Sequence, residues 1–256
     1  MLYFKFLNNY VREKYIGKQL KESVKNIKIP VLICSYNRLY YLKKIINQLN
    51  KFSIKPIVLD NNSNNEDLLK FYKKKSKKYF LIKLFKNYGH NVIYEKFIYK
   101  NLPKIFAYTD CDISLNNKIK KNFLFYLRGL TEKYKIQKVG FAIDVNSIKK
   151  IKLRIGYRNR NNRIISKYVD AKKYEKQFWE TLVQKKPAAY EAKIDTTFAV
   201  YNKKYITKNK LIGIRVADNF TCKHLPWERE NKEPLKELKY YKKSKRKDIS
   251  ATVYKK

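Results

Sequence analysis

Two aspartates one residue apart, Asp110 and Asp112, follow an apolar run in the stretch FAYTDCDISL. The run is short, β-branched or aromatic, and comes after Pro103, so it predicts a buried strand. Two carboxylates about 4–6 Å apart repel by roughly 3–4 kcal/mol at an effective dielectric near 20. A divalent cation removes that cost, since Mg²⁺ binds one or two carboxylates together with phosphate oxygens. The D-x-D pattern is short and common, and a solvated turn would also explain it, so the neighbouring elements must decide.

Three further strands are predicted before Asp110, and a polar loop follows each of them. The apolar runs cover 29–34, 57–59 and 79–85, and segments with helical spacing separate them. Alternating strands and helices with short connections predict a parallel, doubly wound sheet. The loops that follow its strands then meet at one edge, where open α/β sheets bind ligands. These loops are 35–38, 60–65, 86–91 and 110–114.

The pattern changes after residue 116. We expect a helix around 123–130, strands at 139–143, 196–201 and 211–216, a basic irregular segment over 149–172, and a helix after it. Because no internal repeat or Gly/Ser linker interrupts the chain, we expect one compact unit. Its predicted parts are a helical lead-in (1–27), a main domain (28–230, with halves 28–115 and 116–230) and a basic tail (231–256).

The charge balance suggests an anionic partner. The 256 residues include 61 basic and 21 acidic residues, a net charge of +40, with an ordinary hydrophobic content of 44%. Only 10 of the basic residues are Arg, and Lys, Asn, Ile and Tyr all have A/T-rich codons, so part of this charge reflects base composition. Specific base readout relies on bidentate Arg contacts. We therefore favour a phosphorylated substrate and peripheral contact with an anionic membrane over a specific nucleic-acid partner.

The cysteines and the apolar runs bound the location. Cys34, Cys111 and Cys222 are far apart and form no CxxC pair, which predicts neither a disulfide framework nor a structural zinc site. The first residues meet charges too early for a signal peptide. No apolar run approaches the roughly 20 residues of a membrane span. We expect a cytoplasmic protein that can lie at the inner face of the membrane.

Four motifs, PVLICSYNR, IVLDNNS, NYGHN and FAYTDCDISL, occur in this order and spacing. Together they resemble the nucleotide-sugar glycosyltransferases of GT-A fold, in particular the family 2-like group of bacterial polysaccharide enzymes, over roughly residues 28–228. The segments KIDTTFAVYNK and RVADNFTCKHLPWE look like the acceptor side of that group. The resemblance implies a Rossmann-like, mostly parallel central sheet flanked by helices. It also implies transfer of a sugar from a UDP- or GDP-sugar to a glycan or lipid-linked glycan, with Mn²⁺ or Mg²⁺.

The resemblance also implies roles for individual residues. Asp112 would bind the metal directly, Asp110 would contact ribose or reach the metal through water, and His224 would add a late metal or diphosphate contact. Asp195 would be the general base of an inverting reaction. The implied nucleotide contacts are Ser35, Tyr36, Arg38, Asp60, Asn61, Asn87, Gly89 and Asp110, with Asn62 nearby.

Each role has an alternative. Asp195 could simply begin a strand, and Glu191 and Glu180 are its rivals as the base. Members of the group often carry Glu-Asp at this position, whereas this chain has KIDT, which leaves the stereochemical outcome open. His224 could be a packing residue, and His90 is a weaker candidate for a nucleotide contact. We interpret Asp144 as structural and expect Cys111 to point away from the ligand. The basic segment 149–163 either binds a pyrophosphate or is a solvated loop with four arginines, Arg154, Arg158, Arg160 and Arg163.

Two other functions compete with this one. A sugar-phosphate nucleotidyltransferase shares the acidic strand ends, but it calls for a glycine-rich loop after the first strand, and SYNRLYY has no glycine. A non-enzymatic nucleic-acid-binding protein would use the charge of +40 and the interleaved tyrosines. That function leaves the aspartates at the strand ends unexplained.

Overall fold

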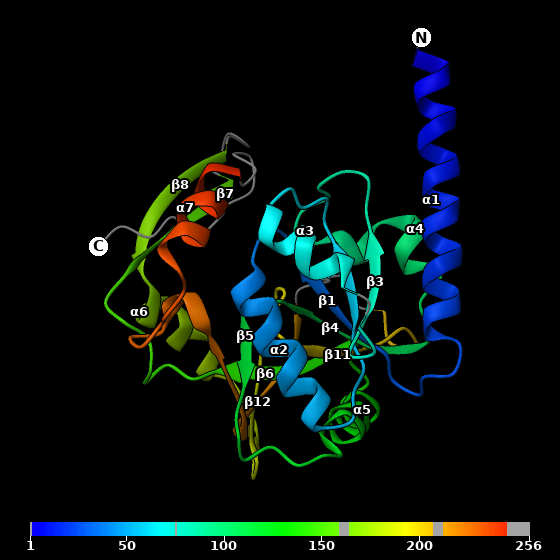
Figure 1. The fold of residues 1–256 in the computed structure, drawn as a ribbon. Coiled ribbons are helices and arrows are strands. Elements are labelled where there is room, and N and C mark those ends of the chain that lie inside the picture. Colours follow the sequence, from blue (N-terminus) through cyan, green and yellow to red (C-terminus); the bar gives the residue numbers. More distant parts are fainter. Residues whose placement is uncertain (1, 75, 159–163, 207–211, 245–256) are drawn as a thin grey trace.

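The computed structural model describes residues 2–74, 76–158, 164–206 and 212–244. Within these residues a central ten-stranded sheet has the order β3-β2-β1-β4-β11-β6-β12-β10-β9, with β5 paired to β12. Helices pack around this sheet (Figure 1). The strands are β1 (Val31–Ser35), β2 (Ile57–Asp60), β3 (Phe80–Lys83), β4 (Ile105–Asp110), β5 (Ile113–Leu115), β6 (Lys138–Ile143), β9 (Leu182–Lys185), β10 (Ala188–Lys193), β11 (Ala199–Asn202) and β12 (Ile212–His224). The α-helices are α1 (Leu2–Val24), α2 (Leu39–Lys51), α3 (Glu66–Lys73), α4 (Lys96–Tyr99), α5 (Phe123–Lys133), α6 (Ala171–Lys176) and α7 (Leu235–Ser244).

The first half of the chain forms the parallel part of the sheet. β3, β2, β1 and β4 lie side by side in parallel, and the register places Cys34 opposite both Leu59 and Asp110. β1 is buried at every position, as expected for a strand covered on both faces. α3 begins at Asn65, whose side chain accepts a hydrogen bond from the Leu68 amide. The carboxyl ends of β1, β2 and β4 therefore lie at one edge.

The second half extends this sheet with strands of both directions. β11 runs antiparallel to β4 and β6, whereas β6 and β12 are parallel, and β10 and β5 are antiparallel to β12. Most strands still point the same way. The predicted α/β fold class, with a mostly parallel, Rossmann-like central sheet flanked by helices, is confirmed.

Several predicted elements of this half are wrong. The segment expected to be irregular forms an antiparallel hairpin of β7 (Lys152–Arg158) and β8 (Ile164–Asp170). The helix expected after it ends in a short 3-10 turn, η2 (Gln177–Trp179), and is followed by the unpredicted β9 and β10. β12 continues to His224 rather than ending at Val216, through an irregularity in which Asp218 has φ 56°. The longer strand is important because it carries His224 back to the aspartates.

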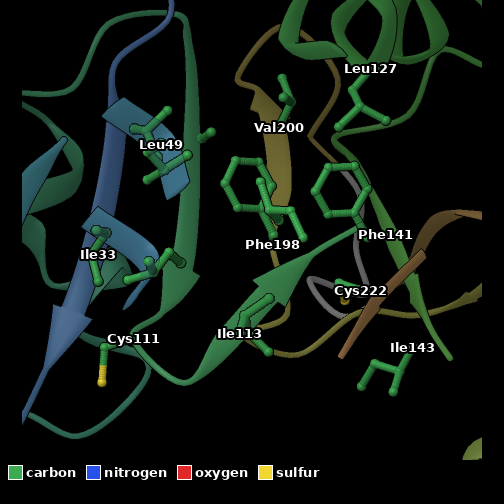
Figure 2. Packing of buried hydrophobic residues seen from close by; sticks show 14 of the residues in the cluster. Ile33, Leu49, Cys111, Ile113, Leu127, Phe141, Ile143, Phe198, Val200 and Cys222 are labelled. Carbon is green, nitrogen blue, oxygen red and sulfur yellow. The ribbon is translucent and has the colours of Figure 1, made fainter. Parts of the chain in front are cut away.

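The core has two layers, one on each face of the sheet. The cluster on one face includes Ile33, Leu49 of α2, Leu127 of α5, Phe141 and Phe198 (Figure 2). On the other face a second cluster includes Leu20 of α1, Leu32, Phe97, Tyr108 and Tyr201. Neighbouring strand residues thus serve opposite faces, as the pleat requires. Both layers hold β1 and β4 rigidly beneath their polar ends.

The N-terminal helix α1 is attached to α4 and β3. From residue 8 onward, where the side chains of α1 are described, Ile16, Leu20 and Val24 are buried, whereas Tyr10 and Tyr15 are more than half exposed. Among the helices that the structure describes, none combines the length and the apolar character that crossing a membrane requires.

Candidate functional site

The strand ends bring Asp112 together with His224. Asp112 lies in the turn between β4 and β5, and its carbonyl accepts a hydrogen bond from the Leu225 amide (2.9 Å), which ties this turn to the end of β12. Asp112 Oδ1 is 3.5 Å from His224 Nε2, and both side chains are about 15% exposed (15% and 16%). Neither Asp112 Oδ1 nor His224 Nδ1 makes a hydrogen bond within the described part of the chain, although both atoms are buried. Buried polar atoms without a hydrogen bond are rare in folded proteins, and an ordered water or a bound ion is the usual reason for them.

The electrostatic surroundings keep His224 neutral. Burial lowers the pKa of His224, and the positive charge of Arg38 lowers it further, while Asp112 acts in the opposite direction. The net pKa lies below the ordinary value of 6.5, so the ring is unprotonated near pH 7. A neutral imidazole is the form that binds metal ions.

Asp110 has a different environment from Asp112. Its Oδ2 accepts a hydrogen bond from the Thr196 hydroxyl, and its amide donates to the Thr196 carbonyl (3.0 Å). Removal from water raises the pKa of Asp110 well above its usual value, and the charge of Asp112 raises it further. The hydroxyl of Thr196 offsets only part of this shift. The end of the sheet that carries Asp110, Asp112 and His224, here called the crevice, therefore disfavours a second negative charge unless a cation enters.

These residues suit a divalent cation that also binds phosphate. Within the described ranges, no three His, Cys, Asp or Glu side chains gather to hold a metal ion. Asp112 and His224 supply one oxygen and one nitrogen donor, while Asp110 is turned toward Thr196. Mg²⁺ and similar hard cations commonly bind through few protein ligands and complete their shell with water and phosphate oxygens. The donor set fits such a cation.

Asp60 and Ser35 lie at the ends of β2 and β1, opposite each other in the register. Asp60 is buried, and its two oxygens accept hydrogen bonds from the Ser63 amide and the Tyr72 hydroxyl, each at 3.1 Å. The Tyr72 hydroxyl also lies 3.4 Å from Ser35 Oγ. Desolvation raises the pKa of Asp60. This carboxylate is already engaged within the loop that follows β2.

Asn61 joins the loop after β2 to the loop after β3. Its side-chain amide donates to the Gly89 carbonyl (2.9 Å), and its oxygen accepts from the Tyr88 amide (2.8 Å). Asn87 accepts from the Gly89 amide at 2.8 Å, and Gly89 has φ 84°, which favours glycine. Three residues predicted from the sequence, Asn61, Asn87 and Gly89, are thus in direct contact. Asn62 follows in the same loop with φ 62°.

Tyr36 and Arg38 are covered by the end of the chain. The Tyr36 hydroxyl donates to the Ser244 carbonyl (2.7 Å), and Arg38 Nη2 lies 3.0 Å from Glu233 Oε1. The side chains of Arg38 and Glu233 are 4% and 2% exposed. Sequence reasoning missed Glu233 and α7. The apolar spacing of Leu235, Leu238 and Tyr241 was the available signal, but lysines surround it.

Asp195 immediately precedes Thr196, whose hydroxyl binds Asp110, so it lies beside the same end of the sheet. Its side chain is 63% exposed and lies 3.7 Å from His90 Nε2. Its charge contributes to the raised pKa of Asp110, so the two carboxylates are near each other. The rivals lie elsewhere: Glu191 is an exposed residue of β10 and Glu180 follows η2. Lys138, which sequence reasoning also missed, holds this segment by donating from Nζ to the Ile194 carbonyl (2.7 Å).

The remaining candidates have ordinary structural contacts. Asp144 accepts from the Asn146 amide (2.9 Å) in the turn after β6, and Cys111 packs into the core (Figure 2). In the basic segment Arg154 donates to Ser166 Oγ (2.8 Å) across the hairpin. Arg158 ends β7, and Arg160 and Arg163 lie outside the described residues.

No protein-family model matches the sequence, and no curated protein matches it. Among solved structures, the chain is similar to a mannosyltransferase from Pyrobaculum calidifontis in complex with GDP-Man and Mn²⁺. The identity is 9% and the TM-score 0.41, over 76% of this chain and 53% of that chain, so this chain spans about half the length of that enzyme.

Two other solved structures are also similar. One is a 4-diphosphocytidyl-2C-methyl-D-erythritol synthase from Anaerococcus prevotii, with 11% identity, a TM-score of 0.33, and coverage of 75% of this chain and 81% of that one. The other is a UDP-glucose pyrophosphorylase complexed with UDP-glucose, with 13% identity, a TM-score of 0.29, and coverage of 62% and 82%. All three likenesses are distant, so the function of this chain rests on its own side chains.

Proposed function

We propose that this chain is a metal-dependent glycosyltransferase that moves a sugar from a nucleotide-diphosphate donor to a glycan or lipid-linked glycan in surface polysaccharide synthesis. The observation that carries the proposal is the Asp112–His224 pair. Both residues present orphaned buried atoms at the carboxyl end of a parallel sheet, beside a second carboxylate, Asp110, that is costly to ionise. A cation with an attached diphosphate would supply the missing partner of Asp112 Oδ1, with His224 as a second ligand.

The donor side of the crevice follows from these positions. Asp112 and His224 would hold Mn²⁺ or Mg²⁺, and Asp110 would reach the ribose or a metal-bound water. When bound, the cation supplies Lewis-acid stabilisation of the departing diphosphate. The nucleotide of a UDP- or GDP-sugar would lie along the loops after β1, β2 and β3, which hold Ser35, Tyr36, Arg38, Asp60, Asn61, Asn87 and Gly89.

The acceptor side would use Asp195. Its exposed carboxylate is at the rim and comes from a different segment than the D-x-D motif. There it can take the proton from an acceptor hydroxyl, a contribution of roughly 10²–10⁴-fold to the rate. A base placed opposite the leaving group gives inversion. The net charge of +40 supports peripheral contact with an anionic membrane that carries lipid-linked acceptors.

The test is the thermal stability of the full chain with UDP, GDP and CDP, each with and without Mn²⁺, and with a short oligonucleotide. We expect one nucleoside diphosphate to raise the midpoint only with Mn²⁺, and Asp112→Ala to abolish this rise. Asp144→Asn is the control, because that carboxylate caps its own turn after β6. Oligonucleotide binding that persists in Asp112→Ala, without any nucleotide response, would contradict the proposal.

Product analysis separates the proposed reaction from nucleotidyl transfer. A glycosyltransferase releases a nucleoside diphosphate from the nucleotide sugar when an acceptor is added. A nucleotidyltransferase instead forms or consumes pyrophosphate with a sugar phosphate and a nucleoside triphosphate. Formation of a nucleotide sugar and pyrophosphate from a sugar phosphate and a nucleoside triphosphate, without acceptor-dependent release of a nucleoside diphosphate, would contradict the proposed reaction and assign nucleotidyl transfer to the same residues.

A further inference from the structure

Residues 231–244, here called the C-terminal strap, cross the loop that follows β1. The Tyr36 hydroxyl donates to the Ser244 carbonyl (2.7 Å), and the Asn37 side chain donates from Nδ2 to Ser244 Oγ (3.0 Å). The strap also contacts the neighbouring loop, because the Tyr240 hydroxyl donates to the Asn64 carbonyl (3.0 Å). Its helix, α7, is the orange segment in Figure 1. The strap thus covers the polar ends of β1 and β2.

Arg38 is almost completely buried between the strap and α2. Glu233 pairs with its guanidinium at 3.0 Å, and the guanidinium lies 4.2 Å from the Tyr241 ring centre and 4.5 Å from that of Tyr41. Glu233 Oε2 also accepts a hydrogen bond from the Tyr41 hydroxyl (3.0 Å). Arg38 is close enough to the Asp112–His224 pair for its charge to lower the pKa of His224. The strap therefore pairs a carboxylate with a buried cation in the neighbourhood of His224.

We propose that the strap occupies the place of the donor, and that the Glu233 carboxylate stands on Arg38 where the donor's diphosphate binds. This inference rests on the proposed function, because it takes the loops after β1 and β2 as the nucleotide site. The strap contacts the Tyr36 hydroxyl, the Asn37 side-chain amide and the Arg38 guanidinium at the same time. Donor binding then requires the strap to leave, which makes residues 231–244 an internal competitor of the nucleotide sugar.

The strap is held in a way that allows it to leave. Glu237 is the only buried residue of α7, and its two carboxylate oxygens accept hydrogen bonds from the Tyr40 backbone amide at 3.0 and 3.1 Å. Leu235, at the start of the helix, is 71% exposed. A hollow of about 660 Å³ separates the start of α7 from α2 and α3, and five of its lining residues are lysines: Lys43, Lys44, Lys70, Lys74 and Lys236. The apolar side chains of α7 are thus at most partly buried. Polar and ionic contacts dominate, and an anionic ligand can replace these.

The experiment measures nucleotide affinity in the full chain by calorimetry. The probes are UDP, GDP and CDP with Mn²⁺, and pyrophosphate with Mn²⁺ to distinguish a free diphosphate from a nucleotide. Glu233→Gln removes the competing charge and leaves Arg38 as a buried cation without its carboxylate partner. We expect this variant to bind the nucleoside diphosphate about 5- to 50-fold more tightly than the wild type. Glu230→Gln is the matched control, since it makes the same charge change at an exposed position three residues earlier.

A second measurement uses the unaltered protein, so the inference does not depend on the variant folding. Amide hydrogen exchange in 235–244 should accelerate when the nucleoside diphosphate and Mn²⁺ are added. Two results would overturn the inference: slower exchange in 235–244, or a Glu233→Gln variant that binds the nucleotide no more tightly than the wild type. Either result would show that the strap forms part of the nucleotide site and does not compete with the nucleotide. If neither protein binds any nucleoside diphosphate, the proposed function fails as well. Asp112-dependent binding without tightening in Glu233→Gln overturns the strap alone.

Discussion

Two buried clusters of charge in this molecule differ in whether their atoms are satisfied. Between α6 and β12, Arg215 pairs with Glu175, donates from Nε to the Lys193 carbonyl (2.7 Å) and stacks 4.2 Å from the Phe178 ring centre. At the sheet edge, by contrast, Asp112 and His224 keep buried atoms without a hydrogen bond. The first cluster is complete in the chain itself. The second keeps buried polar atoms unsatisfied, as expected of a binding site and not of a structural ion pair.

The two clusters also differ in charge balance. Burial raises the pKa of Glu175, but the adjacent Arg215 opposes this shift, so one cation serves one carboxylate. In the crevice Arg38 is paired with Glu233, and Asp110 and Asp112 remain. Removing a residue from a complete pair should damage the fold. Removing a residue from the crevice should weaken ligand binding and leave the free energy of unfolding unchanged or raise it.

The largest effect on stability is expected at the complete pair. Arg215→Met should lower the free energy of unfolding by about 3–5 kcal/mol, because it leaves Glu175 as an uncompensated buried charge. Urea unfolding at pH 7 measures this loss, with Arg229→Met as the control at an exposed arginine. The double variant Arg215→Met/Glu175→Leu should recover most of the loss. A loss below about 1 kcal/mol in the single variant would mean that the Arg215–Glu175 pair contributes little to the free energy of unfolding.

An intermediate and opposite effect is expected for Asp110→Asn. The pKa of Asp110 is raised in the folded chain, so wild-type stability falls as the pH rises through the window above the ordinary value of 3.8. Asp110→Asn removes this cost and should stabilise the metal-free chain by about 1–2 kcal/mol at pH 7.5. The gain should shrink as the pH approaches 4.

Urea unfolding in the presence of EDTA at several pH values tests this prediction, with Asp144→Asn as the control. Adding Mn²⁺ should favour the wild type and reduce the advantage of Asp110→Asn. If the variant is instead less stable than the wild type at pH 7.5, the crevice compensates the charge of Asp110 without a cation, and the contrast between the two clusters fails.

The parallel half of the sheet was predictable because each of its strands is a short apolar run followed by a polar turn. The same rule placed Asp60, Asn61, Asp110 and Asp112 at one edge, and the register of β1 with β2 and β4 agrees. The rule failed for β7 to β10, where lysines and other polar residues interrupt the strands and their pairing comes from distant partners.

The strap was not predictable for a related reason. The hydrogen bond from Tyr36 to Ser244 joins residues 208 positions apart, and its partners are polar groups of common types. Nothing in a lysine-rich helix such as α7 indicates which loop it will cover. In the same way, Lys138 is one of many lysines in the sequence, and only the structure shows it buried beneath the Asp195 segment.

Lys138 is intermediate in character between the two clusters, and its substitution should give the smallest change in stability. It is a buried cation whose Nζ donates to a neutral carbonyl, that of Ile194, and burial lowers its pKa to about 8. Lys138→Met removes both the hydrogen bond and the buried charge, and these effects oppose each other, so unfolding at pH 7 should change by less than about 1 kcal/mol.

A small net change at pH 7 could also mean that Lys138 has no effect on stability. The pH dependence of the free energy of unfolding distinguishes the two explanations. Between the lowered pKa and the ordinary value of 10.5, the folded wild type binds fewer protons than the unfolded chain, so its stability rises with pH in this range. Urea unfolding at pH 7 and pH 9.5 should show this rise in the wild type and a smaller rise in Lys138→Met. The variant should also transfer sugar more slowly, because the segment that carries Asp195 loses the contact that positions it. Equal rises in both proteins, with unchanged transfer, would place Lys138 with the complete, purely structural contacts.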